Sequence, residues 1–399
     1  MTEPRLLTSH PESKPKRPPK PKVSNPVDTA TQAWLESLPA DILDLVPSEI
    51  QIPNVSGAPK RWVVYHPMVL LPSGSFEQIW WKSLFVSVPQ HIDSLWRTVL
   101  EHIGKREGKG LLTHLAINAG IPLNKTDNED DNVLRTPSGL LTLFGDFGPP
   151  LDPTQSPSDR NFQEAFWVST KQNGITQIWA PRYTMFSRGN IKEKARILDF
   201  HNGKATQCKS KSELSKETAV DLYAGIGYFV FSYVKMGMNR VFGWELNPWS
   251  VEGLRRGALA NGWSVKVVRD GDVLDYEDED IVVMLEDNMK ASGRLETLQQ
   301  EKGILSISHV NCGLLPSSEA SWETALGILS GEGWLHLHEN VGVDDIPSRK
   351  SEIEDSLQRA PNEKLKQRQV KAEEVELVKT FAPGVWHCVF DIYINSSTT

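Results

Sequence analysis

The strongest chemical signal in this sequence is a short glycine turn that follows an apolar stretch and precedes a carboxylate. Asp221 closes the apolar stretch, and Gly225 and Gly227 lie in the turn. Glycines at such a turn let the backbone approach a ligand closely. Glu245 comes 24 residues after Asp221, where a carboxylate can accept hydrogen bonds from both hydroxyls of a ribose. The spacing predicts a site for a nucleoside-containing cofactor.

Two cofactor classes suit this arrangement, the nicotinamide dinucleotides and S-adenosylmethionine, and three features favour the second. Bulky residues 228–230 fill the place of the third glycine of a dinucleotide turn and leave little room for a pyrophosphate. Asp221 suits a cationic amino-acid group better than a phosphate. Asp287 and Asn288, after a later apolar stretch, could bind the adenine amino group. A glycine turn alone is also typical of an ordinary strand–helix connection, so the prediction depends on its combination with Glu245 and Asp287.

An alternation of strands and helices must position these residues. From residue 219 onward, apolar stretches of strand length alternate with helical patterns, which is typical of a doubly wound α/β sheet. Asn247 and Pro248 have the residue types of an N-cap and a first helical position. The predicted helices are residues 228–236 and a stretch from Pro248 to about residue 261, and the predicted strands are residues 219–223, 240–244, 265–268, 281–285, 304–309, 334–338 and 385–394.

The region before this sheet is predicted to be a smaller α+β domain. Asn173 and Gly174 separate two apolar stretches and predict a hairpin with a type I′ turn. Helices are predicted at residues 29–45 and 92–103, and strands at residues 61–71, 140–144, 166–170 and 175–179.

A basic helix follows the hairpin. Asn190 and Glu193 have the spacing of a capping box at its start, and Lys192 and Arg196 are predicted to share one face. Two clusters of basic residues occur in the sequence. One lies in the Pro-rich residues 14–22, and the other lies around this helix and consists of Arg182, Arg188, Lys192, Lys194 and Arg196. Such groups can bind nucleic-acid phosphates despite a net charge of −8, although an exposed charged helix explains them equally well.

The composition excludes several other classes. The 399 residues contain three widely spaced cysteines, so we expect neither a disulfide framework nor a paired-cysteine metal site. The same cysteine pattern predicts a reducing, cytoplasmic compartment. Apolar runs are too short to span a membrane, and no secretory signal opens the chain. His336 and His338 alternate on one strand without other ligands at metal-site spacing, so we predict a structural role and no bound metal. Cys312 has no basic neighbour that would make it a nucleophile.

Several separate motifs together resemble one known family, the tRNA wybutosine-synthesizing protein 2 family, whose members are tRNA aminocarboxypropyl transferases related to the tRNA guanine-N1 methyltransferases. The resemblance runs from about residue 135 to residue 393. Residues 187–194 and 311–318 are its most specific parts, whereas the glycine turn alone is not specific. The matching segments are residues 135–137, 143–146, 183–194, 221–229, 245–248, 309–318, 335–341 and 381–383.

The resemblance implies a class I methyltransferase (Rossmann-like) fold and a set of cofactor contacts. By position, the contacts to S-adenosylmethionine would be Ser187, Lys194, Glu245 and the pair Asp287 and Asn288, beside the turn itself. Each of the first three also has a purely structural interpretation. Ser187 could close a loop, Lys194 could be a solvated charge on a helix, and Glu245 could cap the following helix.

The sequence departs from the family pattern at two places. The acidic insertion at residues 276–280 moves the Asp-Asn pair, which makes Asp272 a rival to Asp287 for the adenine. The family's Asn-Leu-Gly is Asn-Cys-Gly here, beginning at Asn311, which we expect to lie where the acceptor base approaches. No general base is assigned.

The implied reaction transfers the 3-amino-3-carboxypropyl group of S-adenosylmethionine to the 4-demethylwyosine base at position 37 of tRNA(Phe), and methylthioadenosine leaves. The alternatives are a tRNA guanine-N1 methyltransferase and a non-catalytic tRNA-binding protein on the same fold. The predicted domains are a disordered basic tail (1–27), an N-terminal domain with a tRNA-binding role (28–160), a hairpin and connecting helix (161–217) and a catalytic domain (218–396). Arg182, Arg188, Lys192 and Arg196 are the predicted contacts to tRNA phosphates.

Overall fold

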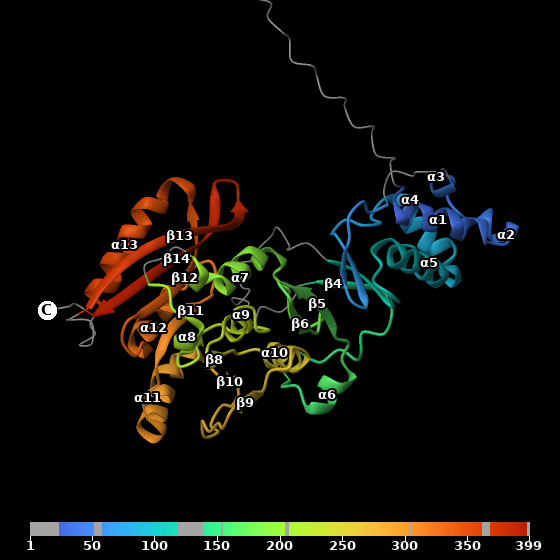
Figure 1. The fold of residues 1–399 in the computed structure, drawn as a ribbon. Helices are drawn as coiled ribbons and strands as arrows, with labels where there is room; N and C mark the ends of the chain where they lie inside the picture. The colour runs from blue at the N-terminus through green and yellow to red at the C-terminus, as the bar shows by residue number, and fades with distance from the viewer. Residues whose placement is uncertain are drawn as a thin grey trace, which may run out of the picture. The chain divides into compact units, whose positions relative to one another are not determined.

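The computed structural model describes residues 24–51, 58–118, 139–152, 155–203, 207–303, 305–360 and 368–396. The basic residues 14–22 and the motif at 135–137 lie outside this part. The chain divides into two compact units (Figure 1). One is built from Met1–Lys60 and Phe76–Gly108, and the other from Arg61–Ser75 and Lys109–Thr399.

The first unit is helical. It contains α1 (Pro26–Glu36), α2 (Ala40–Leu43), α3 (Ser48–Gln51), α4 (Ile79–Ser87) and α5 (Pro89–Glu107). The predicted single helix over residues 29–45 is wrong, because Pro39 disfavours helical backbone before it and stands instead at the N-cap of α2. The helix predicted at 92–103 is confirmed as part of α5, which ends at Gly108 in left-handed conformation. Trp34 of α1 is buried and donates its indole N–H to Ser94 Oγ of α5 (2.9 Å).

The second unit begins with a four-stranded sheet in the order β1-β2-β3-β4. The strand predicted over residues 61–71 is two antiparallel strands, because Pro67 interrupts it after His66. The Asn173–Gly174 hairpin is confirmed, with both turn residues at positive φ (51° and 72°). The bounds are β1 (Val63–Tyr65), β2 (Met68–Leu71), β3 (His114–Asn118), β4 (Leu140–Phe144), α6 (Asp159–Glu164), β5 (Val168–Gln172) and β6 (Ile175–Trp179).

The main sheet has eight strands in the order β13-β14-β12-β11-β7-β8-β10-β9, and β14 runs against both of its neighbours. This confirms the doubly wound α/β fold. The strands are β7 (Thr218–Asp221), β8 (Arg240–Trp244), β9 (Val265–Arg269), β10 (Ile281–Leu285), β11 (Ile307–Cys312), β12 (Gly333–Gly342), β13 (Arg368–Ala382) and β14 (Val385–Ser396). Neither β13 nor the helix before it was predicted, and β11 lies further along the chain than the predicted residues 304–309.

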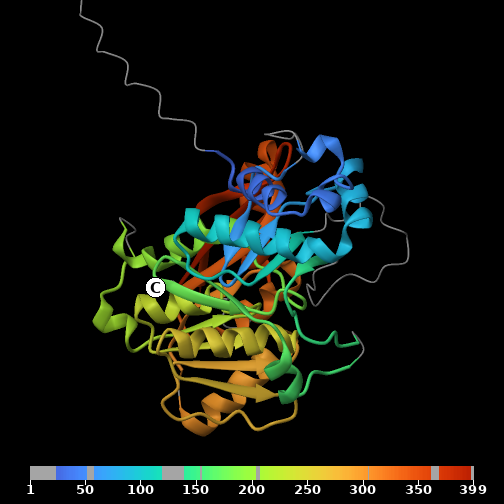
Figure 2. The ribbon, with the colours of Figure 1, turned by 90° about the vertical axis from the view of Figure 1, so that its right-hand side faces the viewer.

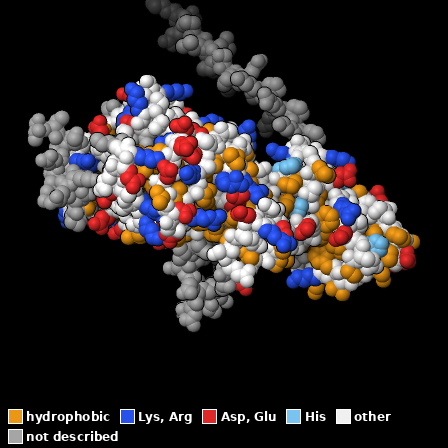
Figure 3. Space-filling view, turned by 90° about the horizontal axis from the view of Figure 1, so that it is seen from below, with side chains coloured by type: hydrophobic (Ala, Val, Ile, Leu, Met, Phe, Trp, Pro, Cys, Tyr) orange, Lys and Arg blue, Asp and Glu red, His pale blue; other side chains and the backbone are white. Residues whose placement is uncertain are grey.

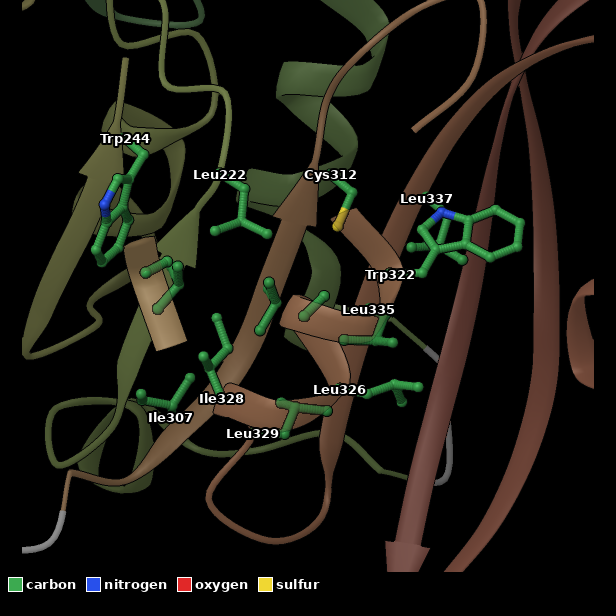
Figure 4. Packing of buried hydrophobic residues seen from close by; sticks show 14 of the residues in the cluster. Leu222, Trp244, Ile307, Cys312, Trp322, Leu326, Ile328, Leu329, Leu335 and Leu337 are labelled. Atoms are coloured by element: carbon green, nitrogen blue, oxygen red, sulfur yellow. The ribbon is translucent and has the colours of Figure 1, made fainter. Parts of the chain in front are cut away.

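Helices cover both faces of this sheet. Along β8, Val241 packs into the core under α7 to α10, whereas the next residue, Phe242, packs into the core under α11 to α13. Figure 4 shows the second core, where Leu222, Cys312 and Leu335 of the strand side pack beside Trp322 and Leu326 of α12. The helices are α7 (Ile191–Leu198), α8 (Lys211–Leu214), α9 (Val230–Met236), α10 (Pro248–Ala260), α11 (Ala291–Lys302), α12 (Trp322–Ile328) and α13 (Ile346–Arg359).

The hairpin β5–β6 packs on α10, and both views show the two side by side (Figures 1 and 2). Asn261 at the end of α10 accepts from the Thr176 N–H (2.9 Å) and donates to the Thr176 carbonyl (2.7 Å). The hairpin is thereby fixed to the helix that follows Glu245. No helix in the described ranges is long and apolar enough to cross a membrane.

Candidate cofactor and acceptor site

The glycine turn lies where β7 ends and α9 has yet to begin. Gly225 and Gly227 adopt positive φ (54° and 90°), which disfavours other residues. A Cβ atom on Gly227 would lie 2.5 Å from the Phe231 ring, so the turn also requires glycine for space. The backbone of the turn therefore requires glycine at both positions, as the sequence analysis predicted.

Glu245 follows the last residue of β8 and is bound to the turn. One carboxylate oxygen accepts from the Gly225 N–H (2.9 Å) and the other from the Asn247 N–H (2.8 Å). Burial raises the pKa of Glu245, while these backbone bonds act in the opposite direction. Asn247 caps α10 by accepting from the Trp249 N–H (2.9 Å), as its residue type predicted. The carboxylate thus lies beside the glycine turn, at the carboxyl end of the neighbouring strand.

The strand order separates Asp287 from its rival Asp272. β10 lies between β8 and β9, so Asp287 and Asn288 follow the strand next to Glu245, whereas Asp272 follows the edge strand. Asn288 donates its amide to the Leu222 carbonyl in the turn (2.8 Å). Asp272 accepts from the backbone of its own loop, at the Arg269 N–H (3.1 Å). The geometry favours the Asp287 position as the neighbour of the turn.

Two exposed apolar side chains flank these polar residues and were missed by the sequence analysis. Leu246, after Glu245, is 39% exposed, and Met289, after Asn288, is 65% exposed. Apolar side chains at the carboxyl ends of the strands in a Rossmann-like fold are suited to contact with the adenine base of a cofactor. Their position directly after each polar residue was the available signal.

Asp221 and Asn311 form a buried pair at the ends of adjacent strands. β11 runs parallel to β7 with Asn311 opposite Asp221, and the Asn311 amide donates to one Asp221 oxygen (3.0 Å). The other Asp221 oxygen and the Asn311 side-chain oxygen are buried and have no hydrogen-bond partner within the described ranges. Burial raises the pKa of Asp221 to about 6. Two acceptor oxygens without donors suit a cationic amine.

Ser187 and Lys194 both adjoin Tyr228, the residue after the turn. The Ser187 N–H donates to the Tyr228 hydroxyl (2.9 Å), which donates to the Met185 carbonyl (2.8 Å). Lys194 is 3% exposed, so it is not a solvated helix charge. Its ammonium donates to the amide oxygens of Gln172 (2.6 Å) and Gln177 (2.8 Å), and burial lowers the pKa of Lys194 to about 8.

The basic helix differs from its prediction. Asn190 makes no side-chain cap, so the capping box is wrong. Glu193 is buried and binds Arg196 (2.7 Å), which also pairs with Asp391 of β14. Arg196 is therefore not an exposed phosphate contact, although it lies one helical turn after the exposed Lys192 on α7.

The other predicted phosphate contacts have different environments. Arg188, at the start of the short turn η1 (Arg188–Asn190), is exposed. Arg182 is partly buried, and its Nε atom has no partner in the part of the chain that the structure describes. On the face in Figure 3, Lys and Arg side chains lie interspersed with Asp and Glu.

The buried histidines form a hydrogen-bonded chain that sequence analysis did not foresee. The Lys209 N–H donates to His201 Nδ1, so His201 Nε2 carries the proton and donates to His309 Nε2 (2.9 Å). His309 Nδ1 then donates to His336 Nε2 (3.0 Å), and His336 Nδ1 donates to Asp391 (2.7 Å). Both ring nitrogens of His336 are thus hydrogen-bonded to other side chains.

The second predicted structural histidine and the cysteine have other surroundings. His338 Nδ1 bonds to His387 Nε2 (2.9 Å), but His338 Nε2 has no partner among the described residues. No group of three or more His, Cys, Asp or Glu residues in the described ranges is placed to hold a metal ion. Cys312 is buried, and burial raises the pKa of its thiol to about 12, so it is not a nucleophile at neutral pH.

Comparison with known proteins identifies relatives that share this fold. The chain is 43% identical over 357 residues to tRNA wybutosine-synthesizing protein 2 of Schizosaccharomyces pombe, which covers 88% of this chain and 76% of that protein. It is 35% identical over 376 residues to the protein of that name from Saccharomyces cerevisiae, covering 85% and 75%. A crystal structure of the Pyrococcus horikoshii wybutosine-synthesizing protein 2 in complex with methylthioadenosine superposes with a TM-score of 0.53 at 18% identity, covering 92% of this chain and 99% of that one. No protein-family model matches.

The Rossmann-like sheet and the likeness to the wybutosine-synthesizing proteins together define an S-adenosylmethionine-dependent transferase. Identity of this extent over most of both proteins then decides the family. The chain belongs to the tRNA wybutosine-synthesizing protein 2 family.

Proposed function

We propose that this protein transfers the 3-amino-3-carboxypropyl group of S-adenosylmethionine to the 4-demethylwyosine base at position 37 of tRNA(Phe), with release of methylthioadenosine. The observation that carries the proposal is the 43% identity with a wybutosine-synthesizing protein 2 over most of both chains. The buried acceptor oxygens of Asp221 and Asn311 beside the glycine turn support it, because they fit the ammonium of the amino-acid arm.

The proposed roles follow from the side chains in reach of the turn. Glu245 accepts from the ribose hydroxyls, and Asp287 with Asn288 binds the adenine. Asp221 and Asn311 bind the ammonium of the arm. Ser187 and Lys194 adjoin the turn through Tyr228 and are proposed as further contacts.

The reaction needs orientation more than acid catalysis. A ring carbon of the acceptor forms a bond to Cγ of the arm while the bond between Cγ and sulfur breaks, and the electron pair of that bond neutralises the sulfonium. The ring carbon then loses its proton to solvent, which restores the conjugated ring. Because the leaving group is already cationic, no general acid is required, and holding the acceptor carbon in line with Cγ and sulfur supplies the main rate advantage.

Partner and compartment are part of the same proposal. Arg182, Arg188 and Lys192 are proposed contacts to the phosphates of tRNA(Phe), and no metal is required by this chemistry. We place the protein in the cytoplasm, because its three cysteines are free.

One labelling experiment tests the transfer. The protein is incubated with tRNA(Phe) that carries 4-demethylwyosine and with S-adenosylmethionine labelled in either the methyl or the carboxyl carbon. Carboxyl label in the RNA supports the proposal. Methyl label in RNA that carries guanine at that position would instead support a tRNA guanine-N1 methyltransferase, and no label in either RNA would support a non-catalytic tRNA-binding protein. A reaction without the protein serves as the control for background labelling.

A further inference from the structure

Lys379 is a partly buried cation at the carboxyl edge of the main sheet. On β13 it lies opposite His387 of β14, which in turn lies opposite Asn340 near the end of β12. Its aliphatic stem packs against Gly189, where a Cβ atom would lie 2.6 Å from Lys379 Cδ. The Lys379 ammonium lies 3.4 Å from Ser187 Oγ. These contacts place Lys379 at the same edge of the sheet as the glycine turn.

The charge of Lys379 has no partner of opposite sign in the described ranges. Burial lowers the pKa of Lys379, and no carboxylate opposes that effect. His387 and His338 are themselves buried, and burial together with the charge of Lys379 lowers their pKa values, to about 4 in the case of His387. A partly desolvated ammonium without a counter-charge costs free energy, so an anion that binds here is stabilised.

The surrounding contacts lead from Lys379 to the cofactor turn. The Lys379 ammonium lies beside the Ser187 hydroxyl. The backbone N–H of Ser187 donates to the Tyr228 hydroxyl. Tyr228 directly follows Gly227. The other lysine beside Tyr228 is Lys194, but its ammonium is already bonded by two glutamine amides. Of these two ammonium groups, Lys379 therefore keeps more N–H donors for an anion, since its one side-chain partner in the described ranges is the Ser187 hydroxyl.

We propose that Lys379, together with Ser187 Oγ, binds the carboxylate of the amino-acid arm of S-adenosylmethionine. The inference rests on the proposed function, in which this arm is the group that moves. The arm carries an ammonium and a carboxylate on one carbon. Asp221 and Asn311 supply acceptors for the first, and Lys379 and Ser187 supply donors for the second. Binding both charges restricts rotation of the arm, which a reaction at Cγ requires.

Equilibrium binding of three nucleosides tests this role. S-adenosylmethionine and S-adenosylhomocysteine carry the carboxylate, whereas methylthioadenosine lacks the whole arm. Titration calorimetry with Lys379→Met is expected to show about ten- to a hundredfold weaker binding of the first two, the usual range for losing a hydrogen bond to a charged group. Methylthioadenosine affinity should stay within about twofold, since it loses no contact.

Two further variants complete the test. Lys371→Met removes an exposed lysine of the same strand, bonded to Glu373 (2.9 Å), and should leave all three affinities unchanged. Lys379→Arg keeps the charge and should retain most of the affinity for the two carboxylate ligands. Normal binding of methylthioadenosine also shows that a variant is folded.

Two outcomes would overturn the inference, and a third separates it from the proposed function. Equal losses for all three ligands would mean that Lys379 only supports the fold of the site. Unchanged nucleoside binding with weaker tRNA binding would make its anion a phosphate. If the wild-type protein labels RNA from the methyl group while Lys379→Met still loses only the carboxylate ligands, the inference stands and the proposed function fails.

Discussion

Replacing Arg196 with methionine should destabilise the protein without directly weakening tRNA binding. The guanidinium lies between Glu193 and Asp391, whose side chains are 0% and 2% exposed. Asp391 keeps a second donor, His336 Nδ1 at 2.7 Å, after the substitution. Glu193 keeps no ion-pair partner among the described residues. Methionine has a similar length and no charge, so the variant removes the ion pairs while filling much of the space.

The magnitude follows from one uncompensated buried charge rather than two. Removing one partner of a buried ion pair costs about 3–5 kcal/mol, against a total of about 5–15 kcal/mol for a typical protein. In urea unfolding followed by far-UV circular dichroism, the midpoint should fall by about 1 M or more. Lys192→Met, four residues earlier and exposed, should change the free energy of unfolding by no more than about 0.5 kcal/mol.

A second variant separates charge from packing. Adding Glu193→Gln and Asp391→Asn to Arg196→Met removes all three charges, and part of the lost stability should return because no buried charge remains unpaired. The reasoning is refuted if Arg196→Met unfolds at the wild-type urea concentration. It is also refuted if the folded variant binds tRNA more weakly with a salt dependence reduced by about one phosphate contact.

Three further predictions concern the site and the histidine chain. Glu245→Ala should weaken S-adenosylmethionine and methylthioadenosine alike, by about tenfold or more, because both carry the ribose; unequal losses in calorimetry would contradict this. Asn311→Ala removes the donor to Asp221 and an acceptor for the ammonium of the arm, so in steady-state assays it should raise KM for S-adenosylmethionine by about tenfold or more and leave KM for the tRNA within about twofold; a change in KM for the tRNA alone would argue against the proposed role. Burial lowers the pKa of His201 to about 4, below the unfolded value of about 6.5, so the unfolded state binds the proton first. Stability should fall by up to roughly 3 kcal/mol as pH drops from about 6.5 to about 4, and His201→Gln should flatten this slope in urea unfolding; an unchanged slope would exclude His201 as its source.

Local signals were sufficient for much of the fold. The Asn173–Gly174 turn, the Asn247 cap and β8 were predicted because each depends on a few neighbouring residues. The strand β13 was missed for a physical reason. Its pairing with β14 shifts register at three places, so apolar residues do not alternate regularly, and of its apolar residues only Ala372 and Val378 are buried.

The candidate site was predictable as far as strand ends define it. The turn, Glu245 and Asp287 come together because carboxyl ends of parallel strands share one edge. Distant partners were not predictable. Glu193 had the spacing of a capping residue, and its role as a buried partner of Arg196 depends on Asp391, which is 195 residues from Arg196. Lys379 was not predicted as a site residue, because the strand that carries it, β13, was not predicted.

The path of the chain between its two compact units bears on how the protein can be dissected. It leaves the helical unit after residue 60, forms β1 and β2 in the larger unit, returns at Phe76 and leaves again after Gly108. A fragment starting after Gly108 lacks β2 and exposes the backbone edge of β3, which invites aggregation. One starting at residue 61 keeps α5 without α1, whose Trp34 packs on it. Isolating the transferase sheet therefore takes two deletions, with an artificial crossover joining Ser75 to Lys109, because β2 and β3 run parallel.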